Sequence, residues 1–327
     1  MSEVQKFMFD GMPVRGVLVR LTDVWVEILR RRTMAGAAYP LPVQNLLGEM
    51  VAAAALMQSN IKFNGALILQ VFGDGPVKLL VAEAQSDFGL RATATVVGEL
   101  APDAGLSSLV NLNNEGKCAI TLDPRDRLPG QQTYQGVVRL SGEDNEKLEK
   151  LSDVLQRYMR QSEQLDTTMV LAADDRSAAG LLIQRLPIAG AANLAGTARA
   201  QVDTDDVDAN EDYQRIAMLA SSLQRDELLG LDTDTVLRRL FWQENLRRFE
   251  PVLTDPLPHF SCACSRDRVG KMIRGLGADE VQGILAELGE VEVACEFCGA
   301  QQRFDSVDVA QLFKTDLKAP AASTARH

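Results

Sequence analysis

The sequence predicts an α+β protein in three parts: an N-terminal mixed α/β core domain, a helical linker and a small C-terminal domain. Three observations indicate this division. Strand and helix patterns fill the first 187 residues, the composition changes after Pro187, and four of the five cysteines lie between Cys262 and Cys298. With 327 residues, the chain has room for two or three domains of roughly 100–200 residues each.

The core domain is expected to contain a β-hairpin and several further strands. The apolar runs Gly65–Gly73 and Val77–Glu83 flank the turn signal Asp74–Pro76, which predicts two antiparallel strands. Pro187 ends the last strand, because proline cannot donate to a ladder. Further strands are expected at Val14–Thr22, Leu90–Val97, Cys118–Leu122, Gln135–Leu140, Thr168–Ala172 and Gly180–Leu186.

Two helices are predicted in the same domain. Apolar side chains from Leu46 to Ala55 fall on one face at helical spacing, and alanine fills much of the remainder, so this helix should be well buried. A second helix is expected over Glu146–Gln161, where leucine, tyrosine and methionine keep the same spacing.

Residues 188–255 are predicted to form a metastable helical linker. Helices are expected near Asp212–Leu229 and Asp234–Glu250, the second capped by Thr233 or Asp234. Repulsion within an acidic run disfavours compaction, so the fold of this segment should be marginal. The alternative is a charged surface region of a larger domain. The acidic run consists of Asp203, Asp205, Asp206, Asp208, Glu211 and Asp212.

The last 70 or so residues read as a compact unit. Two short helices carry apolar faces at Val269–Leu276 and Val281–Leu288, and a glycine follows each as a stop signal. Short strands are expected at Val291–Cys295 and Gln302–Phe304. A unit of this size needs a staple to hold its fold. The tail from Lys318 onward is expected to be disordered.

The cysteines of this unit supply a candidate staple. Cys262 and Cys264 form a C-x-C pair, and Cys295 and Cys298 form a C-x-x-C pair thirty residues further on. Four thiolates are a common ligand set for structural Zn²⁺, so one zinc ion per reduced chain is predicted. The alternatives are four ordinary buried thiols or a thiol–disulfide oxidoreductase. His259 is then a surface residue, because four thiolates complete the zinc shell.

The residues around the first pair permit redox chemistry without demanding it. Arg266, Arg268, Lys271 and Arg274 follow this pair and favour thiolates. Oxidation would remove the zinc ligands, and structural zinc supplies on the order of 10–16 kcal/mol in small zinc peptides. Loss of the metal should therefore unfold the C-terminal unit. Cys118 lies apart from this cluster and is expected to be a buried strand thiol without a redox role.

Charge and composition exclude several other functions. The net charge is −11, which opposes binding to nucleic acid and disfavours the rival interpretation as a zinc-ribbon nucleic-acid module. Two histidines offer little to a catalytic triad, and no phosphate-binding glycine loop is present, so no enzyme is predicted. The longest apolar run, Met50–Met57, is far shorter than the ~20 residues of a membrane span. Without a secretory signal pattern, a cytoplasmic location is expected.

The cysteine spacing and its surroundings resemble the heat-shock protein 33 family of redox-regulated holdase chaperones. The likeness runs through nearly the whole chain, up to about Phe313. The matching stretches are Phe260–Val269, Cys295–Gly299, Leu46–Glu49, Lys62–Gly65, Ser162–Gln164, Gly180–Gln184, Arg239–Glu244 and Phe249–Pro251. Gln302 departs from the pattern, because many members have an aromatic residue there; the change could loosen the zinc module without touching the ligands.

The resemblance implies an ATP-independent chaperone that binds unfolding client proteins under oxidative stress. By the resemblance, residues 1–187 are the core domain, 188–255 the linker and 256–327 the zinc-binding redox-switch domain. The reduced, zinc-bound form is nearly inactive. Oxidants such as hypochlorous acid, or peroxide with heat, join Cys262 to Cys264 and Cys295 to Cys298, expel zinc and unfold the linker. The active form commonly dimerises, and neither nucleic acid nor membrane is an expected partner.

Overall fold

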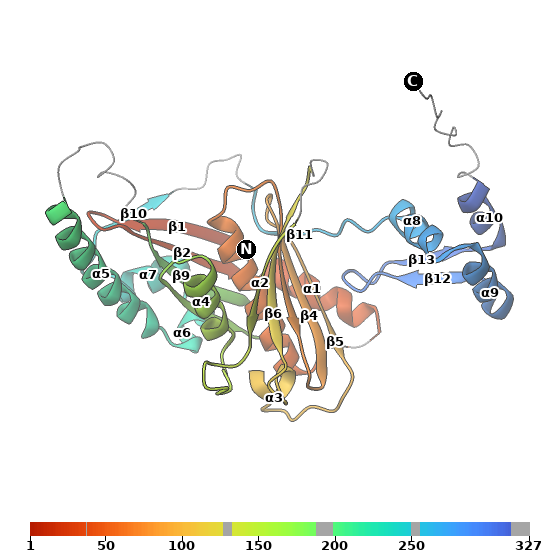
Figure 1. Cartoon of the computed structure of the whole chain (residues 1–327), viewed down its shortest axis with the longest axis horizontal. Helices are drawn as coiled ribbons and strands as arrows, with labels where there is room; N and C mark the ends of the chain where they lie inside the picture. The colour runs from red at the N-terminus through yellow and green to blue at the C-terminus, as the bar shows by residue number, and fades with distance from the viewer. Residues whose placement is uncertain (37, 127–132, 188–198, 250–255, 315–327) are drawn as a thin grey trace, which may run out of the picture.

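The computed structural model describes residues 1–36, 38–126, 133–187, 199–249 and 256–314, with the backbone alone for 199–209. Two β-sheets form the body of the molecule, and a small C-terminal unit lies to one side of them (Figure 1). The expected α+β class is confirmed.

The first sheet has five antiparallel strands in the order β10-β1-β2-β9-β8. Its edge strand β10 comes from the segment predicted as linker, and pairs with β1 through Lys6 opposite Phe249. The strands are β1 (Glu3–Phe9), β2 (Val14–Leu21), β8 (Thr167–Ala173), β9 (Ala178–Arg185) and β10 (Leu246–Phe249).

The second sheet has six strands in the order β11-β5-β4-β3-β6-β7. All neighbours are antiparallel except β11, which pairs in parallel with β5. Because β11 directly precedes Cys262, this sheet positions the first cysteine pair. The strands are β3 (Gly65–Phe72), β4 (Val77–Gln85), β5 (Gly89–Val96), β6 (Lys117–Pro124), β7 (Tyr134–Arg139) and β11 (His259–Phe260).

Helix α2 (Leu41–Ser59) lies between the two sheets and contacts strands of both. It is buried around most of its circumference, which explains why alanine occupies four consecutive positions from Ala52 to Ala55. Gly48 allows α2 to pack closely against β8, since a Cβ atom on this glycine would stand 2.4 Å from the Cβ of Ala173. Helix α1 (Asp23–Met34) buries Trp25, whose Nε1 donates to the carbonyl of Asp174 at 2.7 Å.

Helices α5 (Arg199–Ser221), α6 (Arg225–Gly230) and α7 (Thr233–Leu240) cover the outer face of the first sheet (Figure 1). Their buried side chains form a second core with the strands. Phe241 packs edge-on against Phe9 at 5.0 Å between ring centroids, and Ile216 and Leu237 are fully buried beside them. The helices predicted as linker are thus docked in this structure. The remaining helices of the body are α3 (Leu106–Val110) and α4 (Leu151–Ser162).

The C-terminal unit has a small core of its own. Five buried side chains, including Ile273, Val281 and Phe304, form its centre. Gly289 ends α9 in the left-handed conformation, with φ 79°, which glycine adopts without strain. The unit contains α8 (Arg266–Leu276), α9 (Ala278–Leu288), β12 (Val291–Ala294), β13 (Gln301–Phe304) and α10 (Ser306–Lys314).

The predicted strands are confirmed within two residues at each end, and the apolar faces from Leu46, Val269 and Val281 lie in helices that begin three to five residues earlier. The hairpin forms as β3 and β4, the buried helix as α2, and the two short C-terminal helices as α8 and α9. The strands predicted in the core domain correspond to β2 and β5–β9. Residues 188–198 and the tail from Lys318 lie outside the described residues, so their expectations stay untested.

Three helix predictions are wrong in extent. The helix expected over 146–161 begins at Leu151, because Ser141 and Lys147 form an isolated bridge. The helix expected over 212–229 is two helices, since Gln224 and Glu227 cap the start of α6. The third is the helix expected over 234–250.

The helix expected over 234–250 ends at Leu240. Residues 246–249 become the edge strand β10 instead, because pairing with β1 overrides the helical propensity of leucine and arginine. Its cap is neither Thr233 nor Asp234: the Asp232 carboxylate accepts the backbone N–H of Thr235 at 2.9 Å. The strand β1 and the helices α1, α3 and α10 were not predicted.

Candidate metal centre

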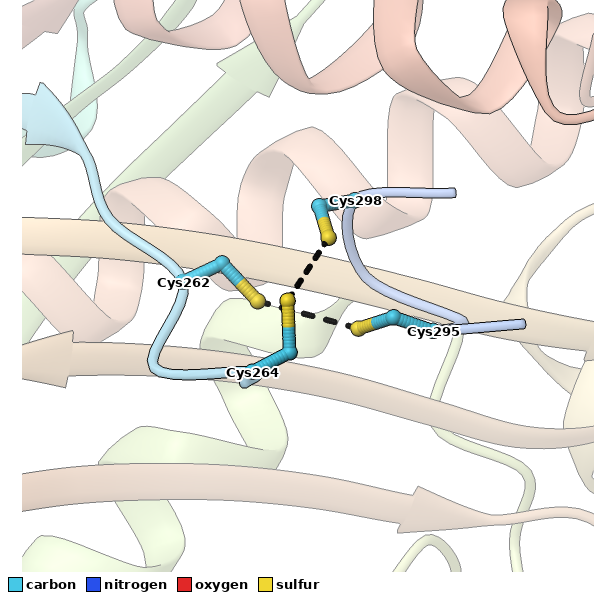
Figure 2. Close-up of side chains that lie close together, drawn as sticks. All are labelled: Cys262, Cys264, Cys295 and Cys298. Atoms are coloured by element: carbon cyan, nitrogen blue, oxygen red, sulfur yellow. Dashed lines mark hydrogen bonds between the residues drawn. The ribbon is translucent and has the colours of Figure 1, made fainter. Parts of the chain in front are cut away.

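The four clustered cysteines come from two loops of the C-terminal unit. Cys262 and Cys264 lie between β11 and α8, and Cys295 and Cys298 lie in the turn between β12 and β13. Figure 2 shows the four side chains converging on one point. The Sγ atoms of Cys262 and Cys295 are 3.7 Å apart, those of Cys264 and Cys298 are 3.1 Å apart, and all four lie within 4.8 Å of one another.

Local backbone chemistry holds each loop. Ser265 caps α8, its Oγ accepting the N–H of Arg268 at 3.2 Å, so the helix starts directly after the first pair. In the second loop the Cys295 carbonyl accepts the N–H of Gly299 at 2.7 Å, and the Cys295 N–H donates to Ala300 at 2.9 Å. Gly299 takes φ 71°, a conformation that closes the turn and favours glycine.

The arrangement matches a tetrahedral thiolate site. With Zn–S bonds of about 2.3 Å, neighbouring sulfurs in a tetrahedron stand about 3.8 Å apart. The 3.7 Å separation between Cys262 and Cys295 is close to this value, the 3.1 Å separation between Cys264 and Cys298 is shorter, and all five cysteines are free thiols. Four cysteine ligands suit zinc and other thiophilic metals. The donor set therefore fits a metal ion.

An arginine from the core domain reaches this centre. The Arg91 guanidinium, on β5, lies 3.7 Å from the Sγ of Cys262 and 4.3 Å from the ring centroid of Phe297. Glu83 on β4 orients it, accepting from Arg91 Nε at 2.9 Å. The ion pair is largely buried, with side-chain exposures of 17% and 6%, so it is rigidly placed.

Helix α1 forms a second contact between the core domain and the C-terminal segment. The Arg31 guanidinium stacks over the Phe260 ring at 4.2 Å. Gly299 lies against the end of α1, where a Cβ atom on the glycine would stand 2.8 Å from that of Ala35. The cysteine centre thus lies at an interface with the core domain.

The four thiols have different electrostatic surroundings. Burial raises the pKa of Cys262, but the backbone of Cys264 and the Arg91 guanidinium outweigh it, so that pKa lies below its ordinary value. Burial, together with the neighbouring Cys298 thiol, raises the pKa of Cys264. Burial also raises the pKa of Cys295. Cys262 is therefore the thiol most disposed to be a thiolate among these three.

The structure brings together the four cysteines that the sequence singled out. Cys118 and His259 lie outside this cluster. Cys118 lies on β6, fully buried, and burial raises its pKa to about 12, which makes it a poor nucleophile. His259 is exposed on β11, with its Nδ1 3.0 Å from the carbonyl of Leu257, and does not belong to the cluster. Sequence reasoning missed Arg91 and Glu83, because no local pattern marks a residue that contacts a cysteine 171 positions away.

The known proteins that are similar to this chain in sequence are named as chaperonins. The sequence profile described as "Hsp33 protein" matches residues 2–305, a range that includes all four clustered cysteines. A 33 kDa chaperonin of Chromobacterium violaceum is 42% identical over 326 residues, covering 100% of this chain and 98% of its own. A 33 kDa chaperonin of Methylobacillus flagellatus is 41% identical over 320 residues, covering 98% and 97%.

The fold agrees with a solved structure. The crystal structure of a 33 kDa chaperonin from Thermotoga maritima superposes with a TM-score of 0.71 over 97% of this chain and 99% of that one, at 20% identity. The sequence profile and the two relatives are those of a chaperone rather than an enzyme. The chain belongs to the Hsp33 family. Within its described residues, no helix has both the length and the apolar character needed to cross a membrane.

Proposed function

We propose that this protein is an ATP-independent holdase whose client binding is switched on by oxidation of its cysteine centre. The observation that carries the proposal is the convergence of two cysteine pairs, within 4.8 Å, at a contact with the core domain. In the reduced form Cys262, Cys264, Cys295 and Cys298 hold one Zn²⁺ per chain. The metal supplies folding free energy to a unit whose own core contains only a few buried side chains.

Oxidation removes the ligands. Two thiolates lose one electron each and form an S–S bond, while one hypochlorous acid takes up the electrons and a proton and becomes chloride and water. Two such reactions give the disulfides Cys262–Cys264 and Cys295–Cys298. Because a disulfide sulfur is a poor metal ligand, the C-terminal unit then loses its staple. Peroxide with heat is a second route to the same disulfides.

The contacts of the centre suggest how this loss reaches the linker. The chain runs from β10 in the first sheet to β11 in the second and then directly to Cys262. When the C-terminal unit unfolds, the contact of Arg91 with Cys262 and Phe297 is lost, and with it one anchor of this segment. The linker helices upstream are then held by their own packing on the sheet and by the pairing of β10 with β1.

The client surface we propose is the face that those helices cover. Phe7 and Phe9 on β1, and Ile216, Leu237 and Phe241 on or beside the helices, are all almost completely buried against one another. Release of the linker exposes both apolar faces together. Such faces bind unfolded segments, which are themselves rich in exposed apolar side chains.

The domain boundaries stay part of the proposal: a core domain over 1–187, a metastable linker over 188–255 and a redox-switch domain over 256–327. The linker contributes β10 to the first sheet, and the redox-switch domain contributes β11 to the second. We also propose a cytoplasmic location, where thiols stay reduced until stress, and a homodimer as the oxidised, active form.

Peptide mapping by mass spectrometry tests the proposed chemistry. Protein oxidised with hypochlorous acid should contain the disulfides Cys262–Cys264 and Cys295–Cys298, retain Cys118 as a thiol, and suppress aggregation of an unfolded client. Cross-pairing of Cys262 with Cys295, whose sulfurs are 3.7 Å apart, would refute the pairing. Catalytic turnover of a disulfide substrate would indicate an oxidoreductase instead.

A further inference from the structure

A cavity lies between the two sheets. The residues that line it are distant in sequence from the clustered cysteines and take no part in the proposed redox switch. The cavity has a volume of about 340 Å³, within the range of roughly 300–1,000 Å³ typical of small-molecule sites. Strands of both sheets and the ends of α2 and α4 line it. Its walls are mainly apolar and include Met57, Leu67, Ile120, Met159 and Leu182.

One partly buried cation in the cavity lacks a counter-ion. Arg15 on β2 donates to the amide oxygen of Gln184 through Nε, at 3.0 Å, and through Nη2. It has no ion pair with any acid among the residues that the structure describes. Burial without such a partner lowers its pKa. A guanidinium in this setting is complementary to a carboxylate, which it can bind through two parallel hydrogen bonds.

The Gln184 side chain fixes the position of this guanidinium. Only 1% of Gln184 is exposed, and its Nε2 donates to Thr167 Oγ1 at 3.0 Å. With the amide held from one side, its oxygen is presented to Arg15. The guanidinium is therefore preorganised, and its Nη1 group and the second N–H of Nη2 are left for a ligand.

The other charged groups at the cavity leave a net positive charge. Lys62 and Glu163 line it and are exposed, so the cavity opens to solvent on this side. Two tyrosine hydroxyls donate to Glu163, from Tyr158 at 2.6 Å and from Tyr134 at 2.9 Å, which occupies that carboxylate. Lys62 has no ion pair among the described residues. Two cations therefore face one already hydrogen-bonded acid.

We propose that this cavity is a binding site for an amphipathic monocarboxylate, with its apolar body against Met57, Met159 and Leu182 and its carboxylate on Arg15. Lys62 adds a second positive charge at the opening. The chemistry shared by such ligands is one anionic head on an alkyl or aromatic body, and a medium-chain fatty acid is the simplest probe of it.

Titration of the reduced full-length protein with dodecanoate tests the proposal. The readout is the methyl resonances of ¹³C-labelled methionines, because Met57 and Met159 line the cavity, whereas Met218 on α5 is 75% exposed and serves as the control. Saturable shifts of Met57 and Met159, with Met218 unmoved, are expected. Dodecanol, which lacks the charge, should bind at least about tenfold more weakly, the loss of one charge-assisted hydrogen bond.

Variants distinguish recognition of the carboxylate from nonspecific apolar binding of the probe. Arg15→Met should weaken dodecanoate binding by about tenfold or more and leave dodecanol binding unchanged. Arg139→Met, which removes an exposed cation on β7 outside the cavity, should leave both unchanged. If Arg15→Met does not fold, Lys62→Met provides the same comparison at an exposed position, with an expected loss of severalfold. Absence of saturable shifts at Met57 and Met159, or equal binding of dodecanoate and dodecanol, would overturn the proposal.

Discussion

Arg91 and Cys262 lie 171 positions apart in the sequence, yet the guanidinium of the first lies 3.7 Å from the sulfur of the second. The same guanidinium stacks on Phe297, between the two cysteines of the second pair, and is held by Glu83. One core-domain side chain therefore touches both halves of the cysteine centre. A change in the cysteines therefore alters the contacts of a core-domain side chain.

Replacing Arg91 should loosen the C-terminal unit before any oxidation. Arg91→Met removes a hydrogen bond to a charged group, worth about 1.5–3 kcal/mol, and leaves Glu83 buried without its partner. We expect zinc release under a fixed dose of hypochlorous acid to be about tenfold faster, as measured with a zinc dye.

The control is Arg139→Met on the exposed face of β7, which should release zinc at the wild-type rate. The double variant Arg91→Met/Glu83→Gln removes the unpaired carboxylate and should retain the faster release. Wild-type kinetics in both Arg91 variants would show that the contact does not restrain the centre.

Removal of one ligand should partly activate the protein. Cys264→Ser replaces a thiolate by a hydroxyl, a poor zinc ligand, so the bound zinc per reduced chain should fall well below one after dialysis against a chelator. The weakened unit should also suppress client aggregation without oxidant. Cys118→Ala, at a buried cysteine on β6 outside the cluster, is the matched control for zinc content. Zinc affinity equal to wild type in Cys264→Ser would contradict ligation by four cysteines.

Weakening the packing of the linker should activate the protein while zinc stays bound. Phe241 is 2% exposed and packs against Phe7 and Phe9, so Phe241→Ala should cost about 3–5 kcal/mol of packing free energy. We expect holdase activity in the reduced state, measured as suppression of client aggregation, with one zinc per chain retained. Trp242, its neighbour, is 73% exposed, and Trp242→Ala should leave the reduced protein inactive. Equal activity of the two variants would count against the covered face as the client surface.

The contribution of Glu49 to the stability of the reduced protein should fall as the pH rises from about 4.5 to about 7. Burial raises the pKa of Glu49 on α2 to about 7, despite the opposing charges of Arg225 and Lys150. Because the folded state holds this proton more tightly than the unfolded chain does, the favourable contribution is complete below pH 4.5 and is lost through pH 7.

Glu49→Gln mimics the protonated carboxyl and should flatten this dependence. At pH 8 the variant should gain up to about 3 kcal/mol in free energy of unfolding over wild type, and at pH 4.5 the two should agree. Urea denaturation at the two pH values measures both quantities. A wild-type advantage at pH 8 would contradict a penalty for the ionised carboxylate.

Local patterns predicted the elements whose neighbours in sequence are also their neighbours in space. The hairpin β3–β4, with its Asp74–Pro76 turn, and the helices ended by Gly277 and Gly289 belong to this group. The convergence of the four cysteines also followed from spacing, since the two short helices between the pairs return the chain to its starting point.

The errors arose where long-range pairing overrides local preference. Leu246–Phe249 has no strand signal of its own, and only the free edge of β1 makes it a strand.

The acidic Asp305, whose carboxylate accepts the N–H groups of Val307 and Asp308 at 2.9 and 2.8 Å, was an available but overlooked signal for the start of α10. Arg91 could not be found at all, because its partners are set by the docking of two units.

The coupling of zinc loss to client binding is the central claim, and one sample can measure both. The reduced protein, with its zinc content determined, is treated with hypochlorous acid while a zinc dye records release, and aliquots are assayed for suppression of client aggregation. We predict that one zinc ion leaves per chain, that holdase activity rises with the same time course, and that both changes reverse on reduction with zinc present. Zinc that stays bound while activity appears, or that leaves without any gain in client binding, would contradict the account.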